Sequence, residues 1–159
     1  MNKTELSFEI EKAIGNTPGR FAVAFKNLQT KETYFLNEQE YFHAASTMKT
    51  PVMMEVFRLV DEKKIKLNDS ILIVNKFKSI IDGSEYSLDL GTDSDDLVYN
   101  NIGKKMTIES LVYQMITVSS NFATNILIDI VGAQNVMTYL HSFGIKETKV
   151  LRGVEDSKA

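Results

Sequence analysis

The chain of 159 residues contains no cysteine, so disulfide bonds and cysteine-based metal or redox sites are excluded. This absence is compatible with any cellular compartment. An excess of positive charge is also missing, because 18 Lys and Arg residues stand against 21 Asp and Glu residues, a formal net charge of −3. The sequence has no basic stripe, so nothing in it suggests binding to nucleic acid.

Long hydrophobic runs are missing as well. One of the longest, Ile126 to Val131, is short and interrupted by Asp129, whereas a membrane-spanning helix needs roughly 20 apolar residues. The N-terminus leads directly into an amphipathic segment without the apolar stretch of a secretory signal peptide. The sequence is 43% hydrophobic and 25% charged, which is typical of one soluble globular domain. We therefore expect neither a membrane span nor a signal peptide in this sequence.

The hydrophobic periodicity predicts an α+β protein. The first segment has apolar residues at helical spacing and ends at Gly15, and two alternating runs around 21–25 and 33–36 are typical of a β-hairpin. Further helices are predicted at 46–64, from a Thr107 cap through Ile116, at 122–131 and at about 134–142, while 68–105 has the composition of turns and loops. An N-terminal helix and a hairpin of an antiparallel sheet are thus followed by a mainly helical region.

Ser46 and Lys49 are the first candidate catalytic pair, within the sequence Ser-Thr-Met-Lys. A lysine three residues after a serine on a helix shares its face, and it can act as a base if burial lowers its pKa. The alternative is that Ser46 is an ordinary helix cap and Lys49 a solvated side chain. The apolar segments on both sides favour a buried junction.

A second polar cluster, Ser119, Ser120 and Asn121, lies between two helices with apolar faces. Ser119 could relay a proton to a leaving group, and Asn121 could hold a substrate amide. These residues could equally end one helix and cap the next. Near the end of the chain, Glu155 could act as a general base on water, or it could belong to a surface loop held by an arginine-carboxylate pair.

No cofactor or metal is expected. The two histidines, His43 and His141, lack partners at ligand spacing. We interpret His43 as local packing and His141 as a cation near a helix C-terminus.

Taken in order, three motifs resemble the class A β-lactamase-like serine hydrolases, a family related to the penicillin-binding transpeptidases. They are Ala45 to Lys49, Ser119 to Asn125, and Arg152 to Asp156. The resemblance implies that Ser46 is the acylated nucleophile, Lys49 its base or proton relay, and Ser119 a proton shuttle. It also implies that Asn121 contacts the substrate amide and that Glu155 lies on the loop with the deacylating acid. It further implies a periplasmic or secreted location.

The sequence departs from the family pattern in three respects. Ser120 stands where these β-lactamases usually have an aspartate, and Glu155 is displaced by one residue from the usual Arg-x-Glu spacing. A Lys-Thr-Gly strand, which frames the oxyanion hole in the family, is absent. We therefore expect the N-terminal part of such a fold, lacking its C-terminal strands. Its regions would be 1–45 (helix and hairpin), 46–145 (all-α) and 146–159 (start of the active-site loop).

Three functions follow from this pattern. The first is a serine hydrolase that opens a β-lactam or related small amide through an acyl-serine, here incomplete and impaired. The second is a penicillin-binding or sensing module without turnover, and the third is a non-catalytic interaction domain. An unpaired edge of the hairpin would invite self-association or pairing with a complementing C-terminal fragment.

Overall fold

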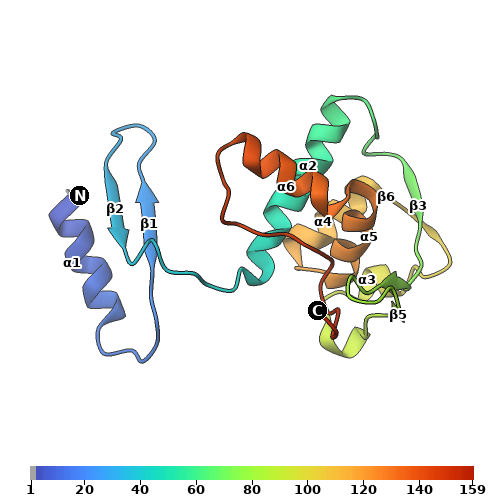
Figure 1. Ribbon diagram of the computed structural model, residues 1–159, viewed down its shortest axis with the longest axis horizontal. Coiled ribbons are helices and arrows are strands. Elements are labelled where there is room, and N and C mark those ends of the chain that lie inside the picture. Colours follow the sequence, from blue (N-terminus) through green and yellow to red (C-terminus); the bar gives the residue numbers. More distant parts are fainter. Residues whose placement is uncertain (1–2) are drawn as a thin grey trace. The chain divides into compact units, whose positions relative to one another are not determined.

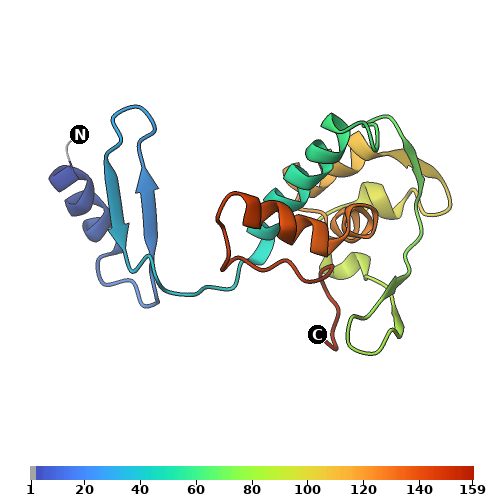
Figure 2. The same cartoon turned by 45° about the horizontal axis from the view of Figure 1, so that its top comes forward.

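The computed structural model describes residues 3–159, and the chain divides into two compact units between His43 and Ala44 (Figure 1). The first unit contains helix α1 (Lys3–Ile14) and the antiparallel strands β1 (Val23–Lys26) and β2 (Thr33–Leu36). Helix α1 lies beside β2 in both ribbon views (Figures 1 and 2). The predicted first helix and hairpin are therefore confirmed.

A side-chain turn closes this hairpin. The Asn27 carboxamide oxygen accepts hydrogen bonds from the backbone N–H groups of Gln29 and Thr30. Asparagine favours turns because its short side chain can bond to the backbone a few residues on. Within the described residues this sheet has two strands, and three of the four residues of β1 are exposed.

The second unit is mainly helical. Its elements in chain order are the 3₁₀ turn η1 (Ala45–Met48), α2 (Lys49–Asp61), β3 (Ser70–Leu72), β4 (Phe77–Lys78), β5 (Glu85–Tyr86), η2 (Leu90–Thr92), α3 (Asp96–Tyr99), β6 (Lys105–Thr107), α4 (Ile108–Thr117), α5 (Asn121–Val131) and α6 (Ala133–Ser142). Two short antiparallel pairs, β3 with β6 and β4 with β5, interrupt the region expected to be irregular. The α+β class is confirmed.

The helix predicted to start at Ser46 begins differently. Residues Ala45–Met48 form a 3₁₀ turn, and the α-helix starts at Lys49. In an α-helix that started at Ser46, the nitrogen of Pro51 would have to donate to the carbonyl of Thr47, and proline has no N–H. With the helix starting at Lys49, Pro51 lies in the first turn, where no such bond is required.

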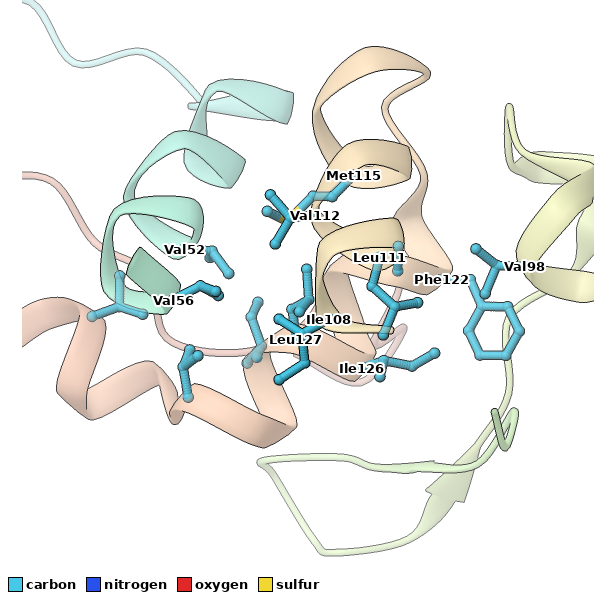
Figure 3. Close-up of a cluster of buried hydrophobic side chains, with 14 of the residues drawn as sticks. Val52, Val56, Val98, Ile108, Leu111, Val112, Met115, Phe122, Ile126 and Leu127 are labelled. Atoms are coloured by element: carbon cyan, nitrogen blue, oxygen red, sulfur yellow. The ribbon is translucent and has the colours of Figure 1, made fainter. Parts of the chain in front are cut away.

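The core of the second unit forms between α2, α4 and α5. Figure 3 shows Val52 and Val56 from α2 facing side chains of α4 and α5, with the ring of Phe122 beside Val98. Leu127 at the middle of α5 is fully buried. Helix α4 buries Ile108, Leu111, Val112 and Met115, whereas Ile116 is 41% exposed.

Truncation of a core leucine tests this packing. Leu127→Ala should lower the free energy of unfolding by about 2–5 kcal/mol, since it removes apolar contacts and leaves a cavity. Urea unfolding followed by circular dichroism measures the change. The control is Leu151→Ala, where the side chain is 62% exposed and we expect a loss below about 1 kcal/mol. Equal losses in the two variants would contradict the position of the core.

Candidate active site

Lys49 is the buried centre of the candidate site. It is the first residue of α2, and only 2% of the residue is exposed. Its Nζ donates to the Ser119 carbonyl, to Ser119 Oγ at 3.0 Å and to Asn121 Oδ1 at 2.8 Å. A buried ammonium is costly unless its donors are satisfied, and here all three hydrogens have acceptors. The alternative of a solvated Lys49 is therefore wrong, and the expected buried position of this residue is correct.

One hydroxyl group, that of Ser119, connects this amine to Ser46. Ser119 Oγ lies 2.9 Å from Ser46 Oγ and 3.0 Å from Lys49 Nζ, so one hydroxyl bridges the other two groups. Ser46 itself is exposed, in the 3₁₀ turn before α2, and makes no side-chain capping bond there. The predicted buried junction therefore applies to Lys49 and not to Ser46. The Ser46 hydroxyl is thus open to solvent and is connected through Ser119 to the buried amine of Lys49.

Ser119 and Asn121 meet Lys49 because of the sharp turn between α4 and α5. Ser119 has a φ of 63°, in the left-handed region that is uncommon for residues other than glycine. Ser120 is the N-cap of α5, and its Oγ accepts from the backbone N–H of Ala123 at 3.0 Å. The capping role anticipated for this cluster thus belongs to Ser120, which leaves Ser119 and Asn121 to face Lys49.

Glu155 joins the same constellation from the end of the chain. Its Oε1 accepts from Asn121 Nδ2 at 2.8 Å, so the carboxamide of Asn121 links Glu155 to Lys49. The Glu155 side chain is exposed, and its φ of 61° is again left-handed. The structure therefore places all five residues selected from the sequence, Ser46, Lys49, Ser119, Asn121 and Glu155, in one hydrogen-bonded group.

Asn125 fixes the segment that carries Glu155, and sequence reasoning gave it no role. Its buried carboxamide accepts from the Val154 N–H at 2.6 Å and donates to the Val154 carbonyl at 3.0 Å. Gly153 lies against this carboxamide so closely that an added Cβ would be 2.4 Å from Asn125 Oδ1. An asparagine one helical turn after Asn121, among apolar residues of α5, was the available signal.

Asp93 was also missed. Its carboxylate accepts from the backbone N–H groups of Asn121 at 3.0 Å and of Phe122 at 2.9 Å. The contact spans 28 and 29 residues, so no local pattern could reveal it. The acidic loop composition around Asp93 predicted only a turn.

Burial has the largest effect on the protonation of Lys49. Burial lowers the pKa of the Lys49 ammonium below its usual value near 10.5, and the carboxylates of Asp93 and Glu155 offset part of this effect. Since a lysine can accept a proton only when neutral, the burial moves Lys49 toward the state a general base requires. Among residues 3–159, no three His, Asp or Glu side chains are placed to hold a metal ion.

A family model described as the β-lactamase enzyme family matches residues 5–159, nearly the whole chain. The chain belongs to the β-lactamase enzyme family. The extended-spectrum β-lactamase PER-1 of Pseudomonas aeruginosa is 26% identical over 147 residues, which are 92% of this chain and 45% of that protein. The resemblance inferred from the three motifs is therefore confirmed.

Solved structures with a similar fold show the same partial coverage. A β-lactamase from Sphaerobacter thermophilus superposes with a TM-score of 0.80 at 29% identity, over 98% of this chain and 53% of that one. The protein PBP-A shares the fold, with a TM-score of 0.75 at 24% identity, over 98% of this chain and 55% of its own. This family member thus spans about half the length of its relatives. No helix of the described residues is long and apolar enough to cross a membrane.

Titration of Lys49 tests the electrostatics directly. We expect its pKa to lie below 10.5, measured from the ¹³Cε shift of labelled lysine with Lys49→Arg as the assignment control. In the pH range between the folded and unfolded pKa values, the folded chain binds fewer protons at this group. The contribution of Lys49 to the free energy of unfolding therefore increases as pH rises through that range. A titration at or above the usual value would contradict the buried environment.

The Gly153 contact gives a second prediction. Gly153→Ala should displace the loop that carries Glu155, because the new methyl group collides with the Asn125 carboxamide. Faster amide exchange at Val154 N–H, measured by NMR, reports the loss of its bond to Asn125. Gly91→Ala is the matched control, since a Cβ there would meet its nearest neighbour, Asp89 Oδ1, at 3.4 Å. Unchanged exchange in the Gly153 variant would show that the loop accommodates the methyl group.

Proposed function

We propose that this chain carries the acylation half of a serine hydrolase that opens a β-lactam or a related small amide through an acyl-serine intermediate. The observation that supports this most is the chain of short contacts from Ser46 Oγ through Ser119 Oγ to the buried Lys49 amine. A serine hydroxyl is a weak nucleophile until a base removes its proton. In this arrangement a neutral Lys49 is that base, reached through Ser119.

The first step of the proposed reaction forms a bond between Ser46 Oγ and the carbonyl carbon of the substrate. The proton of Ser46 passes to Ser119, whose own proton passes to Lys49. When the amide C–N bond breaks, the relay runs in reverse, and Ser119 protonates the leaving nitrogen. The hydroxyl of Ser119 suits both directions because it can donate and accept at once.

The second step, hydrolysis of the acyl-serine, is assigned to Glu155 as the base that activates water. Asn121 orients this carboxylate through its amide N–H, while its oxygen accepts from Lys49. The oxygens of Glu155 already accept hydrogen bonds, one from Asn121 and one from Thr92. Each carboxylate oxygen has two lone pairs, so both oxygens can still accept a hydrogen bond from water.

The second candidate function is a penicillin-binding module that stays acylated, and the displacement of Glu155 by one residue from the Arg-x-Glu spacing supports it. The chain spans about half the length of its relatives and contains no Lys-Thr-Gly sequence. If donors from such a strand stabilise the oxyanion, their lack costs a factor of roughly 10²–10³ for each donor. An impaired hydrolase and a module that stays acylated (an acyl trap) then differ only in the rate at which the acyl-serine is hydrolysed. A periplasmic or secreted location remains part of this proposal.

Intact-mass spectrometry with penicillin G tests the proposal. Wild-type protein should gain the mass of one penicillin G on Ser46, and Ser46→Ala should gain none. Glu155→Gln should be labelled at a similar rate but lose the adduct more slowly, because the base for water is removed while the amide keeps a hydrogen-bonding group. Ser142→Ala, a serine at the end of α6, is the matched control and should behave as wild type.

The outcomes separate the candidates. Labelling that survives Ser46→Ala would refute Ser46 as the nucleophile. An adduct that is equally persistent in wild type and in Glu155→Gln would favour the acyl trap. The absence of any adduct in both wild type and Glu155→Gln would refute acylation of this chain by penicillin G, since a wild type that deacylates rapidly accumulates no adduct.

A further inference from the structure

The segment Thr92–Ser94, at the end of η2, touches three parts of the site with three consecutive side chains. Asp93 accepts from the first two N–H groups of α5, and Ser94 Oγ donates to the carbonyl of Val118 at the end of α4. Thr92 Oγ1 lies 3.1 Å from Glu155 Oε2. We propose that Thr92–Ser94 is a positioning clamp that holds the Ser119 turn for acylation with one part and Glu155 for deacylation with another. The proposal builds on the proposed function and adds residues to which neither the motifs nor the family comparison gave a role.

The need for a clamp follows from the acceptors of Lys49. All three belong to Ser119 and Asn121, so the position of one short turn decides the environment of the buried amine. Ser119 is in the left-handed region, which is unfavourable for a residue other than glycine and persists only where the surroundings enforce it. Ser94 holds the chain immediately before Ser119, and Asp93 holds it two and three residues after.

Asp93 is itself fixed by its neighbours. Its carboxylate accepts from the Ser94 N–H at 2.8 Å and from the Tyr99 hydroxyl at 3.2 Å, besides the two N–H groups of α5. Burial and the nearby Asp93 charge raise the pKa of Tyr99, so its hydroxyl stays a donor over the working pH range. A carboxylate at the N-terminus of an 11-residue helix also interacts favourably with the helix dipole.

Thr92, the first residue of the clamp, contacts Glu155, the proposed base for deacylation. Its hydroxyl is also 3.0 Å from the Asp89 carbonyl, and its single hydrogen can serve only one acceptor at a time. The carboxylate is the stronger acceptor, because hydrogen bonds to ionised groups are roughly twice as strong as neutral ones. Glu155, like Ser119, has a left-handed φ, so the clamp contacts or flanks both strained residues of the site.

Asp93 contacts the start of α5 and Thr92 contacts Glu155, so substitutions at these two residues should affect different steps of the reaction. Asp93→Ala should slow acylation by penicillin G at least roughly tenfold, since it removes two charge-assisted bonds that hold the turn. Thr92→Val should leave acylation within about twofold and slow deacylation by several-fold, since one bond orients Glu155. A loss of global stability alone would not separate the two rates in this way.

The test combines mass spectrometry with two measurements that need no activity. Amide exchange at Asn121 and Phe122 should be at least roughly tenfold faster in Asp93→Ala, and Asp93→Asn, which keeps one acceptor oxygen, should restore part of the protection. Lys49 should titrate at lower pH in Asp93→Asn, because Asp93 and Glu155 are the carboxylates that raise its pKa. The matched control is Asp69, an exposed turn carboxylate that accepts from the Lys66 N–H at 2.8 Å. Its Ala and Asn variants should change none of these quantities.

Each outcome decides the proposal. The clamp would be overturned if the Asp93 variants showed the same amide exchange and the same Lys49 titration as the Asp69 variants. This holds whatever the activity. If neither wild type nor Glu155→Gln forms an adduct, the proposed function with penicillin G fails, and these two measurements still judge the clamp. If Asp93→Ala does not fold, Ser94→Ala replaces it. Slower acylation in Ser94→Ala supports the clamp, and an unchanged rate, or equal effects of Thr92→Val on both steps, overturns it.

Discussion

The site depends on the burial of one ammonium group. Lys49 lies at the start of a helix whose next residues enter the core, so its side chain cannot reach bulk water. Burial of an unpaired amine would destabilise the fold, and the chain meets this constraint with three acceptors from the turn between α4 and α5. The same contacts bring Ser119 between Lys49 and Ser46. The contacts that satisfy the buried ammonium therefore also create the arrangement of Ser46, Ser119 and Lys49.

The turn between α4 and α5 illustrates how stability and chemistry share residues. The N-terminus of α5 leaves N–H groups that need acceptors, and Ser120 and Asp93 supply them. Phe122, in the first turn of the same helix, is fully buried against Tyr99 and Phe77. The core thus fixes α5, α5 fixes Asn121, and Asn121 joins Lys49 to Glu155.

The sequence allowed prediction of most of the fold, because the helices have strong periodicity and recognisable caps. Thr107 is a good example, since its hydroxyl accepts from the Ser110 N–H as its position before an apolar repeat indicates. The start of α2 was predicted incorrectly, because hydrophobic periodicity cannot distinguish a 3₁₀ turn from the first turn of an α-helix. The five site residues were recognisable because they belong to short motifs. Asp93 and Asn125 were missed because their roles arise from contacts about 30 residues apart in sequence.

The attachment of the loop that carries Glu155 has a consequence for how the family can vary. The Asn125 carboxamide pairs with both backbone groups of Val154, much as a neighbouring strand would. Val150 is buried just before it, whereas residues 146–149 are exposed. The position of Glu155 is therefore set by the contacts to α5 and to Thr92 and not by the path of the chain after α6. Insertions and deletions at 146–149 can accumulate between homologues without changing the spacing between this carboxylate and Lys49.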